Sequence, residues 1–83
     1  MRVHQELRMQ SVMERYHLSP REREVARAAL GGLSNREIGA ALCITEQTAK
    51  NHLTAIYQRL ELPPASHTYR RIAMIRRLLD LEG

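Results

Sequence analysis

The chain has 83 residues, which is enough for one small domain and too few for two independent cores. Hydrophobic residues make up 43% of the sequence while Phe and Trp are absent, so aliphatic side chains must build the core, and such a core favours helices over a sheet sandwich. Thirteen Lys and Arg against nine Asp and Glu give a net charge of +4, which points to a polyanionic partner.

Two capping boxes mark the starts of two predicted helices. Ser19-Pro20-Arg21-Glu22 combines an N-cap serine, a proline at the first helical position and a glutamate three residues after the cap. Because Gly31-Gly32 supplies a stop signal, we predict a helix over 20–30. Ser34-Asn35-Arg36-Glu37 is the second capping box, and it predicts a short helix over 34–42.

The rest of the chain contains three more helical patterns. Thr45 is a cap candidate for a longer helix over 45–60, which Pro63 and Pro64 end, and Ser66 caps a final helix over 66–80. The spacing of Met9, Val12, Met13 and Tyr16 indicates a further helix within 2–16. We therefore predict an all-α fold with five helices, divided into an N-terminal helix or linker over 1–17 and a domain over 18–80.

A short helix, a tight turn and a longer capped helix form the helix-turn-helix arrangement, in which the second helix enters the major groove of DNA. The helix over 45–60 has one apolar stripe, formed by Ala49, Leu53, Ile56, Tyr57 and Leu60. Its opposite arc is polar, with Lys50 at its edge, and contains Gln47, Thr48, Asn51, His52, Thr54, Gln58 and Arg59. Glu46 is the one acid, and it lies in the first turn, where the helix dipole favours it. Amides, hydroxyls and cations together suit base edges and phosphates.

Three segments in order carry a resemblance to a known family. They are Leu18-Ser-Pro-Arg-Glu-Arg-Glu-Val25, Gly32-Leu-Ser-Asn-Arg-Glu-Ile38 and Thr48-Ala-Lys-Asn-His-Leu53. Over roughly residues 17 to 80 the chain resembles the LuxR/GerE-type helix-turn-helix family. The resemblance implies a four-helix, bacterial DNA-binding domain of a transcriptional regulator, preceded here by an extra helix, that binds promoter sites on double-stranded DNA as a dimer.

The resemblance also implies roles for individual residues. The positions that meet bases in the family correspond to Lys50, Asn51 and Thr54. Contacts to the DNA backbone are expected from Thr45, Gln47, Thr48, His52, Gln58 and Arg59. Some residues depart from the family pattern: Ala49 replaces Val, Gly39 replaces Ala, and Glu61 replaces the Gly that normally ends the third family helix.

The last helix has two apolar sides. Tyr69, Ile72, Ile75 and Leu79 form one stripe, which we expect to pack on the domain. The other side consists of Met74, Leu78 and Leu81. Because the C-terminal helix is the family's usual dimer surface, we expect these residues to form the homodimer contact. Arg70, Arg71 and Arg77 would flank it. The rival hypothesis is that the N-terminal stripe covers this second side within one chain and leaves a monomer.

The sequence gives no basis for an enzyme. It has no glycine-rich phosphate loop, nucleophile elbow or paired-carboxylate arrangement, so we expect no catalytic residues and no cofactor. His4, His17 and His67 lack partners at ligand spacing, so no metal is expected, and Cys43 is interpreted as a small buried apolar residue. The longest apolar run, Ala40 to Ile44, is far short of the about 20 residues of a membrane span.

Two other functions fit the same helices. One is a protein-interaction module that binds RNA polymerase or another regulator and contacts DNA weakly. The other is a promoter-reading domain of a sigma factor, although the histidine after Lys50-Asn51 and the helix after Pro64 resemble the LuxR type instead. For a DNA-binding protein with no apolar leader we expect a cytoplasmic, nucleoid-associated location.

Overall fold

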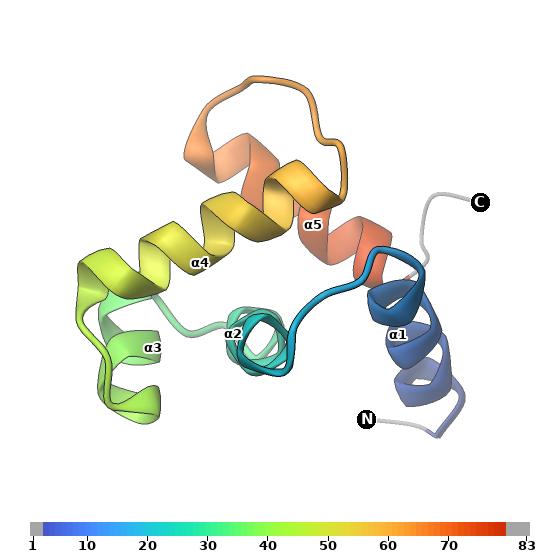
Figure 1. The fold of residues 1–83 in the computed structure, drawn as a ribbon, viewed down its shortest axis with the longest axis horizontal. Helices are drawn as coiled ribbons and strands as arrows, with labels where there is room; N and C mark the ends of the chain where they lie inside the picture. The colour runs from blue at the N-terminus through green and yellow to red at the C-terminus, as the bar shows by residue number, and fades with distance from the viewer. Residues whose placement is uncertain (1–2, 80–83) are drawn as a thin grey trace.

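The computed structural model describes residues 3–79, and all of their regular structure is helical. The helices are α1 (Val3–Arg15), α2 (Pro20–Leu30), α3 (Asn35–Leu42), α4 (Glu46–Arg59) and α5 (His67–Leu78). In Figure 1, α2 lies near the centre and is seen almost end-on, with α3 and α4 to one side, α1 to the other, and α5 running behind α4 toward α1. The predicted all-α fold with an added N-terminal helix is confirmed.

Side-chain caps begin the helices where the sequence predicts them. The Ser19 hydroxyl accepts a hydrogen bond from the Glu22 amide at 3.1 Å, and the Glu22 carboxylate accepts one from the Ser19 amide at 2.7 Å. Ser34 and Glu37 form the same reciprocal pair at 3.2 and 2.8 Å. Each pair satisfies two backbone donors that the first turn of a helix leaves free. The hydrogen bond from Ser34 to the Glu37 carboxylate also lowers the pKa of Glu37.

Three helices end at a non-glycine residue in the left-handed backbone region. His17, Cys43 and Glu61 have φ angles of 59°, 58° and 57° and follow α1, α3 and α4. This conformation turns the chain back, so that the next amide can donate a hydrogen bond to a carbonyl in the last turn of the helix. The Leu62 amide donates to the Tyr57 carbonyl in this way at 3.1 Å. Cys43 is exposed at its turn, so the interpretation of Cys43 as a buried apolar residue is wrong.

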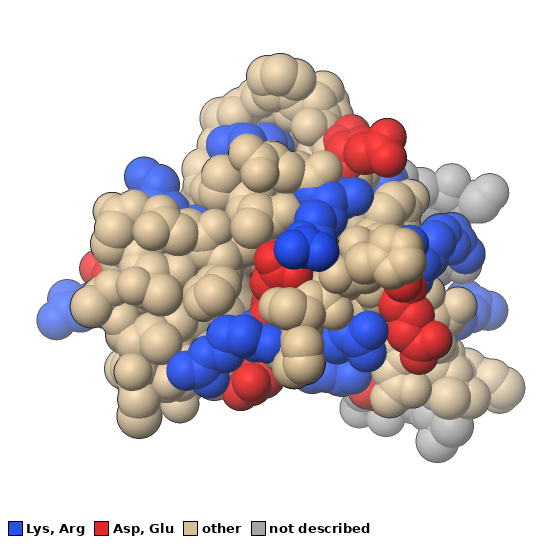
Figure 2. Space-filling view, viewed as in Figure 1, with Lys and Arg blue, Asp and Glu red and all other residues tan. Residues whose placement is uncertain are grey.

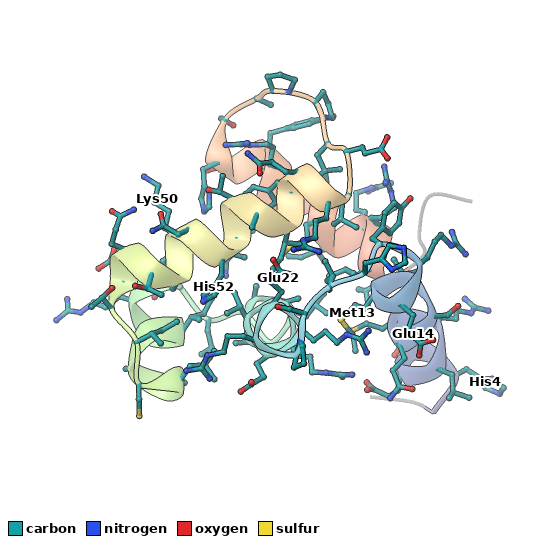
Figure 3. The ribbon with its side chains drawn as sticks, viewed as in Figure 1. His4, Met13, Glu14, Glu22, Lys50 and His52 are labelled. Atoms are coloured by element: carbon teal, nitrogen blue, oxygen red, sulfur yellow. The ribbon has the colours of Figure 1, made fainter. Side chains whose placement is uncertain are left out.

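One core joins all the helices. Its buried side chains include Met9 and Met13 of α1, Val25 of α2 and Ile38 of α3, and Leu53 of α4 is also fully buried. Figure 3 shows Met13 pointing from α1 toward the centre of the molecule, while His4 and Glu14 lie on the outer side of the same helix. Helix α1 thus contributes side chains to the same core as the other four helices.

The α5 side that was predicted to form the dimer contact is buried, and the stripe predicted to pack on the domain does so only in part, with Ile75 against the core. Met74 and Leu78, predicted to form the dimer contact, are fully buried in the core, whereas Tyr69 and Ile72, predicted to hold the domain together, are 54% and 55% exposed. The physical reason is that α1 packs against α5, so the side with Met74 and Leu78 shares one buried cluster with the apolar stripe of α1. Leu81, the third predicted dimer residue, lies outside the described residues.

The predicted flanks of the dimer contact bind within the chain instead. Arg71 donates one hydrogen bond to the side-chain oxygen of Asn35 at 3.0 Å and another to the backbone carbonyl of Leu33. Arg77 donates to the Leu60 carbonyl at 3.0 Å and lies against the Tyr16 ring. These contacts tie α5 to the α2–α3 turn, to the end of α4 and to the end of α1.

Candidate nucleic-acid interface

Helices α3 and α4 approach closely because the chain between them is short and Gly39 has no side chain. A Cβ atom on Gly39 would lie 2.7 Å from the Ile44 carbonyl oxygen and 3.2 Å from the Glu46 amide nitrogen. In this chain the absence of a side chain at Gly39 therefore lets the segment from Ile44 to Glu46 lie directly against α3, at a cost in helix propensity. Arg21 of α2 donates to the Leu42 carbonyl at 2.9 Å and fixes the end of α3. The resulting unit is a helix-turn-helix.

Helix α4 has one buried and one exposed side. Ala49, Leu53, Ile56 and Tyr57 are buried, as the predicted apolar stripe requires. The three predicted base-contacting residues lie close together on the other side: Lys50 and Asn51 are exposed, and Thr54 is half-buried one turn later. The Gln47 side-chain amide donates to the Asn51 side-chain oxygen at 2.9 Å and holds that amide in position.

The N-terminus of α4 is organised around two threonines. Thr45 caps the helix by accepting a hydrogen bond from the Thr48 amide at 3.0 Å, and its own hydroxyl donates to the Thr48 hydroxyl at 2.8 Å. Thr45 and Gln47 are exposed and Thr48 is half-buried. A helix N-terminus carries partial positive charge and free amide donors, so this end of α4 suits an anion such as a phosphate.

The remaining predicted backbone contacts are spread along α4. His52 is half-buried and leaves α4 on a different side from Lys50, as Figure 3 shows, whereas Gln58 is exposed. Arg59 is engaged within the molecule: its Nε lies 3.3 Å from the Glu22 carboxylate and its Nη1 donates to the His17 carbonyl at 2.7 Å. Figure 3 shows Glu22 between α2 and α4, where the residue is only 5% exposed and its buried carboxylate is paired with this cation. Arg59 therefore joins α4 to α2 and to the turn after α1.

Comparison with protein families gives a match over residues 16–72 to the bacterial regulatory proteins of the luxR family. The chain belongs to this family. The match includes the helix-turn-helix and ends within α5. Since regulators of this family are DNA-binding and non-enzymatic, the prediction of a DNA-binding, non-enzymatic transcription-regulator domain is confirmed.

Individual relatives agree with the family. The chain is 49% identical over 45 residues to YhjB of Escherichia coli, whose name describes an HTH-type transcriptional regulator, and 47% identical over 45 residues to the transcriptional regulatory protein DegU of Brevibacillus brevis. Each alignment covers 54% of this chain, but only 22% of YhjB and 19% of DegU. The chain thus spans about a fifth of the length of these relatives. No solved structure matches the chain significantly.

Charge is unevenly distributed over this luxR-family domain. Figure 2 shows acidic side chains over α1, α2 and the turn after α4, whereas the surface over α3 and the first half of α4 is mostly uncharged, with basic groups and one acidic group at its edge. An interface with the DNA backbone requires few carboxylates. The first half of α4 meets this requirement.

Sequence reasoning missed a second polar group at the start of α5. The His67 ring packs edge-on against the Tyr57 ring at a centroid distance of 5.5 Å, and the Arg70 guanidinium lies 5.0 Å from the centre of the Tyr57 ring. Burial lowers the pKa of His67, and the charges of Arg71, Arg70 and Lys50 lower it further. The adjacent arginines of the last helix were a sequence signal for this cluster, but we expected them to flank a dimer contact.

Other kinds of site are not supported by residues 3–79. In that range no three His, Cys, Asp or Glu side chains lie together as metal ligands. Nor is any helix in the same range long and apolar enough to cross a membrane.

Proposed function

We propose that this domain recognises specific DNA sequences by placing α4 in the major groove, with Lys50, Asn51 and Thr54 on base edges. A lysine ammonium suits guanine, an asparagine amide suits adenine, and the threonine methyl suits the methyl of thymine. The observation that carries the proposal is that these three side chains share the outer side of α4 while its inner side is anchored in the core. A firmly packed helix can present them in one fixed orientation.

Contacts to the DNA backbone would fix this orientation. Thr45, Gln47 and Thr48 at the N-terminus of α4 are the proposed phosphate contacts on one strand, and His52 and Gln58 extend them along the helix. We propose that Arg59 acts mainly through its bonds to Glu22 and His17, because its guanidinium already has partners there. The DNA-binding unit is proposed to span residues 18–80, with α1 completing its core.

We further propose that the domain binds paired promoter half-sites as a homodimer. The observation that favours α5 as the contact is its exposed side, because Tyr69 and Ile72 are large apolar residues left more than half exposed. A two-fold axis across α5 would cover both copies of this side at once. The proposed place of action is the bacterial cytoplasm, on the nucleoid.

Selection of bound sites from a random DNA pool tests the proposed function. The wild-type chain is expected to select one sequence, repeated as two half-sites at a fixed spacing. The matched control is Glu46→Ala, which removes a charge from the same helix and is expected to select the same sequence. A pool that stays random for the wild type would contradict the proposal and favour the protein-interaction module, with RNA polymerase or another regulator as partner.

A further inference from the structure

Three buried polar atoms at the α4–α5 junction have no hydrogen-bond partner. They are the Tyr57 hydroxyl, His67 Nε2 and Arg70 Nε. The His67 ring and the Arg70 guanidinium each lie against the Tyr57 ring. Tyr57 itself is only 1% exposed. Buried polar atoms in folded proteins are nearly always paired, so three unpaired ones in a single cluster indicate that a ligand or solvent molecule completes it.

The chemistry of these atoms indicates an acceptor. The Tyr57 hydroxyl and the Arg70 Nε–H are donors, and His67 Nε2 is a donor whenever it carries a proton. Burial raises the pKa of Tyr57 although Arg71 and Arg70 act to lower it, so the hydroxyl keeps its proton at neutral pH. An oxygen atom with several lone pairs can accept from more than one of these donors.

The charge around the cluster indicates that this oxygen belongs to an anion. The charged groups that act on His67 are Arg71 and Arg70 of α5 and Lys50 of α4, all of them cations. The first turn of α5 contains no acidic residue, so the positive end of its helix dipole is not offset there. Arg71 is held by Asn35 and Leu33, which leaves Arg70 as the arginine with an unpaired donor at the cluster.

Lys50 connects the cluster to the helix that faces DNA. Its charge acts on His67, and Figure 3 shows its side chain on the edge of α4 toward the segment that leads into α5. We propose that Tyr57, His67 and Arg70 form a binding site for one backbone phosphate of the DNA, next to the bases that Lys50 contacts. The inference rests on the proposed function and adds a contact from α5 that the helix-turn-helix does not supply.

Binding of the phosphate has a consequence for protonation. In the free domain burial and the neighbouring cations disfavour charged His67. A phosphate next to the ring favours the charged form, so binding takes up a proton and the affinity for DNA rises as pH falls toward 6.

The test compares dissociation constants at several salt concentrations on the DNA site that the wild type selects. Tyr57→Phe keeps the ring in the core and removes only the hydroxyl, and Arg70→Gln removes the charge. Arg76→Gln is the matched control, because Arg76 is an exposed residue of the same helix. We expect Arg70→Gln to weaken binding about tenfold on every sequence and to reduce the slope of log K against log salt by about 0.9, the loss of one phosphate contact. Tyr57→Phe should weaken binding several-fold, and Arg76→Gln should change affinity less than twofold.

A second measurement works with wild-type protein and does not depend on how a variant folds. Replacing single phosphates beside the half-site with uncharged methylphosphonate should identify one position that weakens wild-type binding and reduces its pH dependence. Unchanged affinity and salt slope in both Tyr57→Phe and Arg70→Gln would overturn the site, as would the absence of any such phosphate position. The proposed function would survive that result if Lys50→Ala still altered base preference, whereas a wild-type chain that selects no sequence would overturn both.

Discussion

Glu61 ends α4 with a φ angle of 57°, a conformation that a side chain disfavours and glycine tolerates. Its side chain is exposed, so nothing in the core requires a glutamate there. We expect Glu61→Gly to raise the free energy of unfolding by about 1 kcal/mol. Urea denaturation of the two proteins measures the difference. Glu61→Ala keeps the Cβ atom and should stay within about 0.5 kcal/mol of the wild type, and a less stable glycine variant would show that the strain is absent.

The residue scale is also where sequence reasoning worked best. Ser19 with Glu22 and Ser34 with Glu37 are local patterns, and each determines a helix start from four consecutive residues. The exposed side of α4 was also predictable from a local pattern, because the spacing of the apolar residues along the helix places Lys50 away from the core. The left-handed conformation of Glu61 was not predicted, because it depends on how α4 meets the segment that follows.

At the scale of the element, α5 shows what periodicity cannot decide. The stripe with Tyr69 and Ile72 and the stripe with Met74 are similar in apolar character, so the sequence does not determine which one faces the core. The answer depends on α1, which lies far away in the sequence and packs against α5. The cluster of Tyr57 with residues of α5 was missed for the same reason, because it arises only where α4 and α5 cross.

A pair of aspartate substitutions tests this assignment of the α5 sides. Leu78→Asp places a charge at a fully buried position and is expected to unfold the domain, with a loss of about 3–5 kcal/mol. Ile72→Asp changes a residue that is 55% exposed and should leave the helical circular dichroism signal intact while it abolishes dimers in ultracentrifugation. A folded Leu78→Asp variant that has lost its dimer would restore the originally predicted dimer side.

At the scale of the whole molecule, stability should depend on pH in two separate ranges. The pKa of His67 is lowered from its usual 6.5, so the unfolded chain binds protons more readily than the folded one as pH falls below that value. The pKa of Glu37 is lowered from 4.5, so its stabilising contribution is present above pH 4.5 and is lost as pH falls through its folded pKa. Thermal unfolding is therefore expected to shift to lower temperature in two steps on acidification.

Two substitutions separate these steps. His67→Gln cannot titrate and should reduce the loss of stability between about pH 6.5 and 5, whereas Glu37→Gln should reduce the loss below about pH 4.5 and leave the upper range unchanged. Melting temperatures measured from pH 7.5 to 3.5 give both effects. If His67→Gln lost as much stability as the wild type between about pH 6.5 and 5, the loss in that range would be due to another group.

The central claim is that α4 reads base edges through Lys50, and the most direct measurement is a ratio of dissociation constants. Dissociation constants are measured at one salt concentration for the wild type, Lys50→Ala and the control Glu46→Ala. Each protein is measured on the selected DNA site and on a scrambled duplex of the same length. We predict that Lys50→Ala loses about 1–3 kcal/mol on the selected site and much less on the scrambled duplex, while Glu46→Ala keeps the wild-type ratio. Equal losses on both duplexes would contradict the claim, because they would show that Lys50 contacts phosphate and not bases.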